Sequence, residues 1–179
     1  MSQSYRQILI GIAPVALIGV VALFGVMVAI ESFAATVTAT VTVQNVSVSV
    51  NNASFDYGSV ALNTASSTLQ LYGGAGIVAT NGGNVTEDFD ISGANTTSYT
   101  LDSANSTEDH YIHKFCNDTA DTCTSPPTSY TALTTSPAAL STNVAASGTT
   151  AFQLQITTPE TVSVYDQQSA VVTITASAS

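Results

Sequence analysis

From Thr36 to Ser179, apolar residues recur at every second position in short runs, and turn-forming residues separate these runs. The clearest run is AFQLQITT, in which Phe152, Leu154 and Ile156 alternate with polar residues. Strand side chains point alternately to opposite faces, so a period of two predicts strands that bury one face. No segment after residue 35 has a helical period of useful length. The alternation therefore restricts this part of the chain to an all-β fold.

The runs predict about nine to ten strands at spacings near 8–12 residues, which is typical of two packed antiparallel sheets. We expect an antiparallel two-sheet β-sandwich, immunoglobulin-like or jelly-roll-like, over residues 51–179, with one N-terminal hydrophobic helix before it. TVSVYD and SAVVTITAS are expected to be its last strands. In AFQLQITT the polar residues Gln153, Gln155 and Thr157 are expected to face solvent. The side chains expected to point inward are Phe55, Tyr57, Leu69, Leu71, Phe89, Ile91, Phe152, Leu154, Ile156, Val172 and Ile174.

The N-terminus carries the most hydrophobic segment of the chain, ILIGIAPVALIGVVALFGVMVAI over residues 8–30, after a single basic residue, Arg6. A run of this length can span a bilayer, and the charge before it predicts that the remainder is exported. Ser32-Phe33-Ala34 has the small-x-small form of a signal-peptidase site. Residues 1–35 are therefore either a cleaved signal peptide or a retained membrane anchor. Both alternatives predict an extracellular or cell-surface location.

The charge of the chain excludes one class of partner. Arg6 and Lys114 are the only Lys or Arg residues, against 12 acidic residues, and the net charge is −10. Binding of nucleic acid requires Lys and Arg to neutralise phosphates, so we expect no nucleic-acid partner. The same deficit opposes attraction to an anionic membrane surface, which leaves the N-terminal segment as the membrane contact.

If the chain is exported, its two cysteines can form a disulfide and some of its asparagines can be glycosylated. Cys116 and Cys123 are the only cysteines, and in an oxidising compartment they are expected to form a disulfide that closes the loop CNDTADTC. Asn-x-Ser/Thr sequons are acceptors for N-glycosylation, whose use depends on the organism. They occur at Asn45, Asn52, Asn84, Asn95, Asn105 and Asn117.

The stretch TVTATVTVQNVSVSV, residues 36–50, changes the face of its apolar residues after Gln44-Asn45. One interpretation is a bulge or a crossing point, where a first strand passes from one sheet to the other. The other is a hinge between the domain's own first strand and an extended arm that completes the sheet of a neighbouring subunit. The side chains that would enter the neighbour are those of Val37, Ala39, Val41 and Val43.

No group of residues predicts a catalytic or metal site. Acidic side chains could line a calcium site, but no Ca²⁺-loop motif is present, and solvated carboxylates on the outer face of a strand are the simpler interpretation. His110 and His113 lie three apart on an expected strand, so they point to opposite faces and suit zinc poorly, even with Cys116 nearby. There is no G-x-S-x-G elbow. We expect no enzyme activity and no cofactor. The acidic residues are Glu87, Asp88, Asp90, Asp102, Glu108 and Asp109.

A resemblance covers almost all of residues 36–179. FDYGSVALNTASSTL, ATNGGNVTEDFDISG, LTTSPAALSTNVAASGTTAFQLQITTP and the terminal VVTITAS are similar to a module of predicted surface proteins of uncultured bacteria, which carries no known activity. The order of hydrophobic segment, Val/Thr strand and Ser/Thr/Asn-rich sandwich resembles that of fibre subunits, namely the TasA/camelysin biofilm proteins and archaeal threads built by donor-strand exchange. This second resemblance implies assembly by strand donation.

Two functions remain open at this point. The first is a structural cell-surface protein, a filament or coat subunit that self-associates into a homopolymer. The second is a membrane-tethered module that binds a glycan or a protein through the loops of the sandwich. A filament subunit needs the arm 36–43 to leave its own domain, whereas a binding module would pair it within the domain.

Overall fold

The computed structural model describes residues 35–69, 76–120, 122–123 and 129–179. The chain divides into two compact units, Met1–Thr40 and Val41–Ser179. Both the expected N-terminal helix and Leu71 lie outside the described residues. Within the described residues, no helix is long and apolar enough to cross a bilayer.

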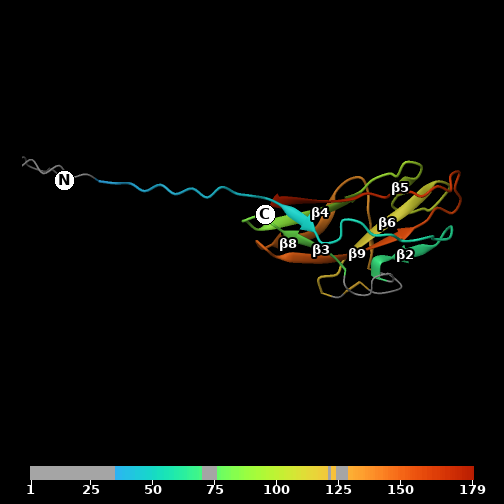
Figure 1. The fold of residues 1–179 in the computed structure, drawn as a ribbon, viewed down its shortest axis with the longest axis horizontal. Helices are drawn as coiled ribbons and strands as arrows, with labels where there is room; N and C mark the ends of the chain where they lie inside the picture. The colour runs from blue at the N-terminus through green and yellow to red at the C-terminus, as the bar shows by residue number, and fades with distance from the viewer. Residues whose placement is uncertain (1–34, 70–75, 121, 124–128) are drawn as a thin grey trace, which may run out of the picture. The chain divides into compact units, whose positions relative to one another are not determined.

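Val41–Ser179 is an all-β unit with two sheets, as the alternation predicts (Figure 1). The larger sheet has the order β1-β3-β9-β6-β5, with β2 paired to β9 and β7 paired to β6. The smaller sheet has the order β10-β4-β8. The larger sheet consists of β1 (Val48–Val50), β2 (Ala65–Ser67), β3 (Ile77–Asn81), β5 (Thr100–Asp102), β6 (His110–Asn117), β7 (Thr131–Ala132) and β9 (Thr149–Thr157). The smaller sheet consists of β4 (Glu87–Gly93), β8 (Ala138–Val144) and β10 (Val172–Ala178).

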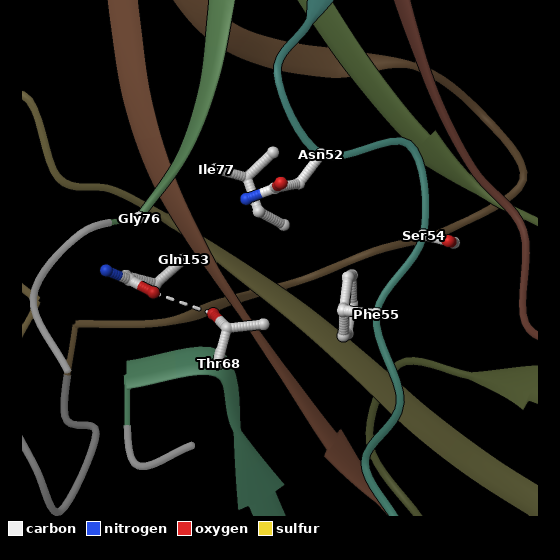
Figure 2. Close-up of a pocket in the computed structure, with 7 residues that line it drawn as sticks. All are labelled: Asn52, Ser54, Phe55, Thr68, Gly76, Ile77 and Gln153. Atoms are coloured by element: carbon white, nitrogen blue, oxygen red, sulfur yellow. Dashed lines mark hydrogen bonds between the residues drawn. The ribbon is translucent and has the colours of Figure 1, made fainter. Parts of the chain in front are cut away.

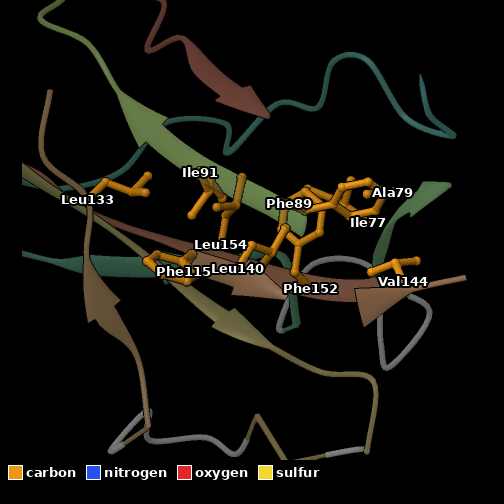
Figure 3. Close-up of a cluster of buried hydrophobic side chains, with 10 residues drawn as sticks. All are labelled: Ile77, Ala79, Phe89, Ile91, Phe115, Leu133, Leu140, Val144, Phe152 and Leu154. Atoms are coloured by element: carbon orange, nitrogen blue, oxygen red, sulfur yellow. The ribbon is translucent and has the colours of Figure 1, made fainter. Parts of the chain in front are cut away.

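The core lies between the two sheets, where their apolar faces meet (Figure 3). Phe89 and Ile91 of β4, and Phe152 and Leu154 of β9, are each at most 2% exposed. Their burial confirms the period-two prediction for both strands. The other predicted inward residues that the structure describes are only half-buried. They are Phe55, Tyr57, Leu69, Ile156, Val172 and Ile174.

Three polar residues expected to face solvent are buried instead. Glu87 has the same parity as Phe89 and Ile91, so it points inward and is 0% exposed. Gln153 and Gln155 do lie on the opposite face of β9 from Leu154, but other segments cover that face. Thr68 and Asp118 both contact Gln153 through hydrogen bonds. The prediction of exposure was therefore wrong at these positions. Glu87 shares the inward face of Phe89 and Ile91, and other segments cover the face of Gln153 and Gln155.

Two further expectations need correction. β5 and β6 are parallel, with Thr100 opposite His110, whereas an entirely antiparallel fold was expected. Residues 103–109 allow this because they double back: Asp102 accepts hydrogen bonds from the N–H groups of Ala104 and Asn105, and Asp109 has a left-handed φ of 55°.

TVSVYD and the segment with Phe55 and Tyr57 are not strands. In TVSVYD, the Ser163 N–H and hydroxyl both donate to the carboxylate of Asp109, so hydrogen bonds to a distant side chain hold this segment in place of strand pairing. Phe55 and Tyr57 still alternate toward the core, but their segment joins no sheet.

The change of parity at Gln44-Asn45 lies where sheet pairing begins. Residues 35–42 are exposed and belong to no strand. Asn84 donates to the carbonyl of Val43 through its side chain, and exchanges two further hydrogen bonds with the backbone of Asn45. Backbone pairing then continues from Asn45 through β1 to Asn51 along the neighbouring strand β3.

Candidate functional site

The large hydrophobic side chains that the described structure leaves exposed gather in two places. Val37, Val41 and Val43 of the arm (residues 36–43) are 94%, 88% and 77% exposed. The others lie along β1 or around a groove beside it. These are Val46, Val50, Leu62, Tyr165 and Val171. Exposed apolar surface of this extent marks an interaction site more often than a solvated surface.

The groove has a volume of about 1420 Å³. Its walls are β1, residues 52–62, the segment 165–172 and the inner face of the larger sheet. Val48 and Val50 line it from β1, and Val172 and Ile174 line it from β10. Clefts for small molecules usually measure about 300–1,000 Å³, so this space suits a longer ligand such as a peptide segment.

β10 forms the open side of the smaller sheet. In the part of the chain that the structure describes, β10 pairs with β4 alone. Its inward side chains at Val172, Ile174 and Ala176 are only half-buried, whereas Leu140 and Val144 on the opposite edge strand β8 are 4% and 7% exposed. The core is therefore closed along β8 and incomplete along β10.

A small cavity of about 160 Å³ adjoins the groove, between Phe55 and β9 (Figure 2). A chain of buried polar groups lies at its wall. The Gln153 amide donates to the Asp118 carboxylate at 2.9 Å and accepts from the Thr68 hydroxyl at 2.7 Å. Thr68 in turn accepts from the N–H of Leu154 at 2.9 Å. Each polar atom in this chain has a partner, so it fixes the outer face of β9 rather than offering a binding site.

His113 and Tyr57 form the polar part of the groove wall. His113 is 1% exposed, and its Nε2 lies 3.1 Å from the Tyr57 hydroxyl. Burial lowers the pKa of His113 to about 4 and raises the pKa of Tyr57. Both side chains are therefore neutral at neutral pH, and the groove wall carries no charge at this point.

We expect the buried His113 to make folding pH-dependent. An unfolded histidine titrates near pH 6.5, so between about pH 6.5 and 4 the unfolded chain binds one more proton than the folded chain. The free energy of unfolding should therefore fall as the pH drops through this window, by at most about 3–4 kcal/mol. Thermal unfolding of the full chain at stepped pH measures this slope.

His113→Gln should flatten that slope, because it removes the buried titrating group. A wild-type slope in His113→Gln would contradict the assignment. The carboxylates with a lowered pKa, such as Asp88 and Asp109, lose their contribution to the free energy of unfolding only below about pH 4. They therefore do not mask the slope that His113 causes.

Cys116 and Cys123 are joined by a disulfide, with their Cα atoms 5.9 Å apart. The Asp118 carboxylate accepts the Cys123 N–H at 3.0 Å, which holds the loop against β9. For so short a loop, the entropic model gives a stabilisation of about 2 kcal/mol. We expect the double variant Cys116→Ser/Cys123→Ser to have a free energy of unfolding lower than that of the wild type by this amount, measured by denaturant unfolding. The unreduced wild-type protein should weigh two hydrogens less than the reduced protein, and two alkylatable thiols would contradict the bond.

The acidic residues considered for calcium do not converge. Asp88 accepts hydrogen bonds from the Asn143 N–H and the Ser179 hydroxyl. Asp102 binds the N–H groups of its own loop, and Asp109 binds Ser163. His110 and His113 lie apart as predicted, since one is buried and the other is partly exposed beside Asp102. Within the described residues, no group of three or more His, Cys, Asp or Glu side chains is placed to hold a metal ion.

The sequons differ in accessibility. Asn45, Asn52, Asn84, Asn95 and Asn105 are exposed, whereas Asn117 is half-buried and its side-chain amide donates to the carbonyl of Leu140. The amide of Asn84 is also engaged, with the carbonyl of Val43. Glycosylation at Asn84 or Asn117 would disturb an existing hydrogen bond.

The arm could be predicted from the sequence, but the groove could not. The groove is formed by segments far apart in the sequence, and the segment with Phe55 and Tyr57 was expected to be a strand. One available signal was the low polarity of VTITAS near the C-terminus, which has no charged residue on either face. Comparison with known proteins adds no assignment: no protein-family model, no curated protein and no solved structure matches this chain.

Proposed function

We propose that this protein is a structural subunit of the cell surface that assembles into a filament or coat by donating its arm to a neighbouring copy. The observation that supports the proposal most is that two surfaces lack a partner strand within the described residues, namely the arm and the open edge of β10. The arm is apolar, extended in sequence pattern and outside any strand, while the sandwich is open along β10. A donated strand gains affinity from backbone hydrogen bonds and specificity from alternate side chains.

The energies are compatible with stable association. Burial of one valine contributes roughly 1.5–3 kcal/mol, and the arm offers Val37, Val41 and Val43. Together with a run of backbone hydrogen bonds, this can offset the roughly 4–15 kcal/mol lost as freedom of motion on association. Lysine on an edge strand opposes pairing between chains, and the only lysine, Lys114, lies on the interior strand β6.

The remaining parts of the chain fit this role. Residues 1–35 act as the export signal or membrane anchor, and the sandwich, of an immunoglobulin-like or jelly-roll-like kind, is the repeating body of the assembly. The Cys116–Cys123 disulfide suits an oxidising location outside the cytoplasm. In this role the protein needs no catalytic group and no cofactor.

A membrane-tethered binding module is the second candidate. Tyr165 is 82% exposed at the groove, next to Asp166 and Gln167. An exposed tyrosine ring with polar neighbours can contact a glycan or a protein through its apolar body and its hydroxyl. This function predicts single molecules on the surface, with the arm paired inside its own domain.

Electron microscopy of negatively stained cells, with antibody against residues 129–179, separates the two functions. A filament or coat subunit should give labelled fibres or a continuous labelled layer. Dispersed single labels without any ordered structure would contradict the proposal and favour the binding module. Cells lacking the gene provide the control for labelling.

A further inference from the structure

We infer that the groove between β1 and β10 receives residues 36–43 of a second copy of this chain, which adds a strand to the open edge of β10. This inference rests on the proposed function and identifies the surface that the proposed function requires.

The backbone of β10 presents unused hydrogen-bonding groups on its open edge. Ser179 donates its N–H to the carbonyl of Thr86, and Ala178 lies opposite Glu87. Hydrogen-bonded pairs alternate along an antiparallel ladder, so Thr173, Thr175 and Ser177 bond to β4. The N–H and C=O groups of the alternate residues therefore point away from β4. These residues are Val172, Ile174, Ala176 and Ala178.

The arm is long enough for this edge and has suitable side chains, and β1 lies close to part of β10. β10 has seven residues, and an arm of eight residues spans about 26 Å at about 3.3 Å per residue. On a strand beside β10, Val37, Ala39, Val41 and Val43 would all point to one face. The groove offers Val48, Val50, Val172 and Ile174 on the side that this face would meet.

Charge favours the same contact. Each chain has a net charge of −10, so two copies repel one another over most of their surfaces. The arm, TVTATVTV, and β10, VTITASA, carry no charged residue. An interface formed by these two segments brings the chains together where their repulsion is weakest.

Backbone pairing around Asn45 opposes a return of the same chain along β10. From Asn45 to Asn51 the backbone runs in one ladder beside β3. To return along β10, the chain would have to reverse at Gln44-Asn45. That reversal would break the hydrogen bonds that Asn84 makes with Val43 and Asn45. The arm of a second copy can enter the groove without breaking these hydrogen bonds.

A pair of substitutions on β10 tests the receiving surface. Val172→Glu places a carboxylate inside the groove, while Thr173→Glu places the same charge on the exposed face of the same strand. Leu62→Glu, at a position 43% exposed on the groove wall, repeats the test where folding is less affected. In the full chain purified from the cell envelope, we expect Val172→Glu and Leu62→Glu to sediment as monomers and Thr173→Glu to assemble.

Complementation between two defective chains gives the decisive result. One chain lacks residues 36–43 and keeps its groove, and the other carries Leu62→Glu and keeps its arm. Each variant alone should remain a monomer. The melting temperatures of the two variants should lie within a few degrees of each other. Mixed in equal amounts, they should form a complex of one copy of each, and no longer assembly.

The outcomes separate this inference from the proposed function. If the wild-type chain assembles and the arm deletion does not, but the groove variants assemble normally, the arm binds elsewhere and the inference is wrong while the proposed function stands. Failure of the mixture to form the complex, with both chains folded, also overturns it. If the wild-type chain is itself a monomer, both fail.

Discussion

Replacing Val41 by proline, or deleting residues 36–43, should leave a folded chain that no longer assembles. Proline removes one N–H donor from the donated strand and one apolar side chain from the groove. The sandwich core lies between β4 and β9 and does not include the arm, so folding should persist. Assembly is measured by sedimentation velocity of the chain recovered from the cell surface. We expect a shift from large particles to monomers.

A matched pair of charges shows whether the arm acts as a strand with two faces. Val41→Asp puts a carboxylate on the face that enters the neighbour, and Thr40→Asp puts it on the opposite face. We expect the first to abolish assembly and the second to reduce it only slightly. Equal effects of the two substitutions would mean that the arm does not bind as an alternating strand.

Gly83→Ala should destabilise the junction between the arm and the domain by about 3 kcal/mol or more, since overpacking of this severity exceeds the ordinary cost. A Cβ atom at Gly83 would clash with the carbonyl oxygen of Asn45 and with Oε1 of Glu87. Glu87 is fully buried and accepts the Ser47 N–H at 2.9 Å. Either the backbone at Asn45 moves outward or Glu87 loses this hydrogen bond. Denaturant unfolding of the full chain measures the loss.

Gly82→Ala is the control, because its nearest contact is the hydroxyl of Ser47 at 3.3 Å, at the end of an exposed side chain that can rotate. We expect it to cost less than about 1 kcal/mol, within the usual range for a surface substitution. Proteolysis near Asn45 should become faster in Gly83→Ala alone. If both glycine variants are equally stable, then Asn45, Gly83 and Glu87 are not packed as described.

Much of the fold could be predicted from local pattern. The alternation in β4 and β9 identified Phe89, Ile91, Phe152 and Leu154 as core residues, and the cysteine count identified the disulfide. Local pattern fails where a distant segment determines the environment. Nothing in the neighbourhood of Gln153 indicates that Thr68 and Asp118 cover it, and the parity of Glu87 predicts its face but not its hydrogen bond to Ser47.

Of the two parts of the candidate site, the arm could be predicted from the sequence and the groove could not. The arm is visible in sequence because its change of parity at Gln44-Asn45 is local. The groove depends on the open edge of β10, which has no second strand beside it among the residues that the structure describes. Phe55 and Tyr57 have the alternation of a strand without the backbone pairing. A period of two shows that side chains alternate between two faces. Whether the backbone of that segment pairs with a sheet depends on which edge strand lies beside it in the fold.

The central claim is that copies of this chain join through the arm. Sedimentation of the wild-type chain at high concentration, combined with limited proteolysis of residues 36–43, tests it most directly. We predict large particles in which the arm is protected, and monomers with a cleavable arm after dilution or after Val41→Pro. A wild-type chain that is monomeric at high concentration, with its arm already protected, would contradict the account.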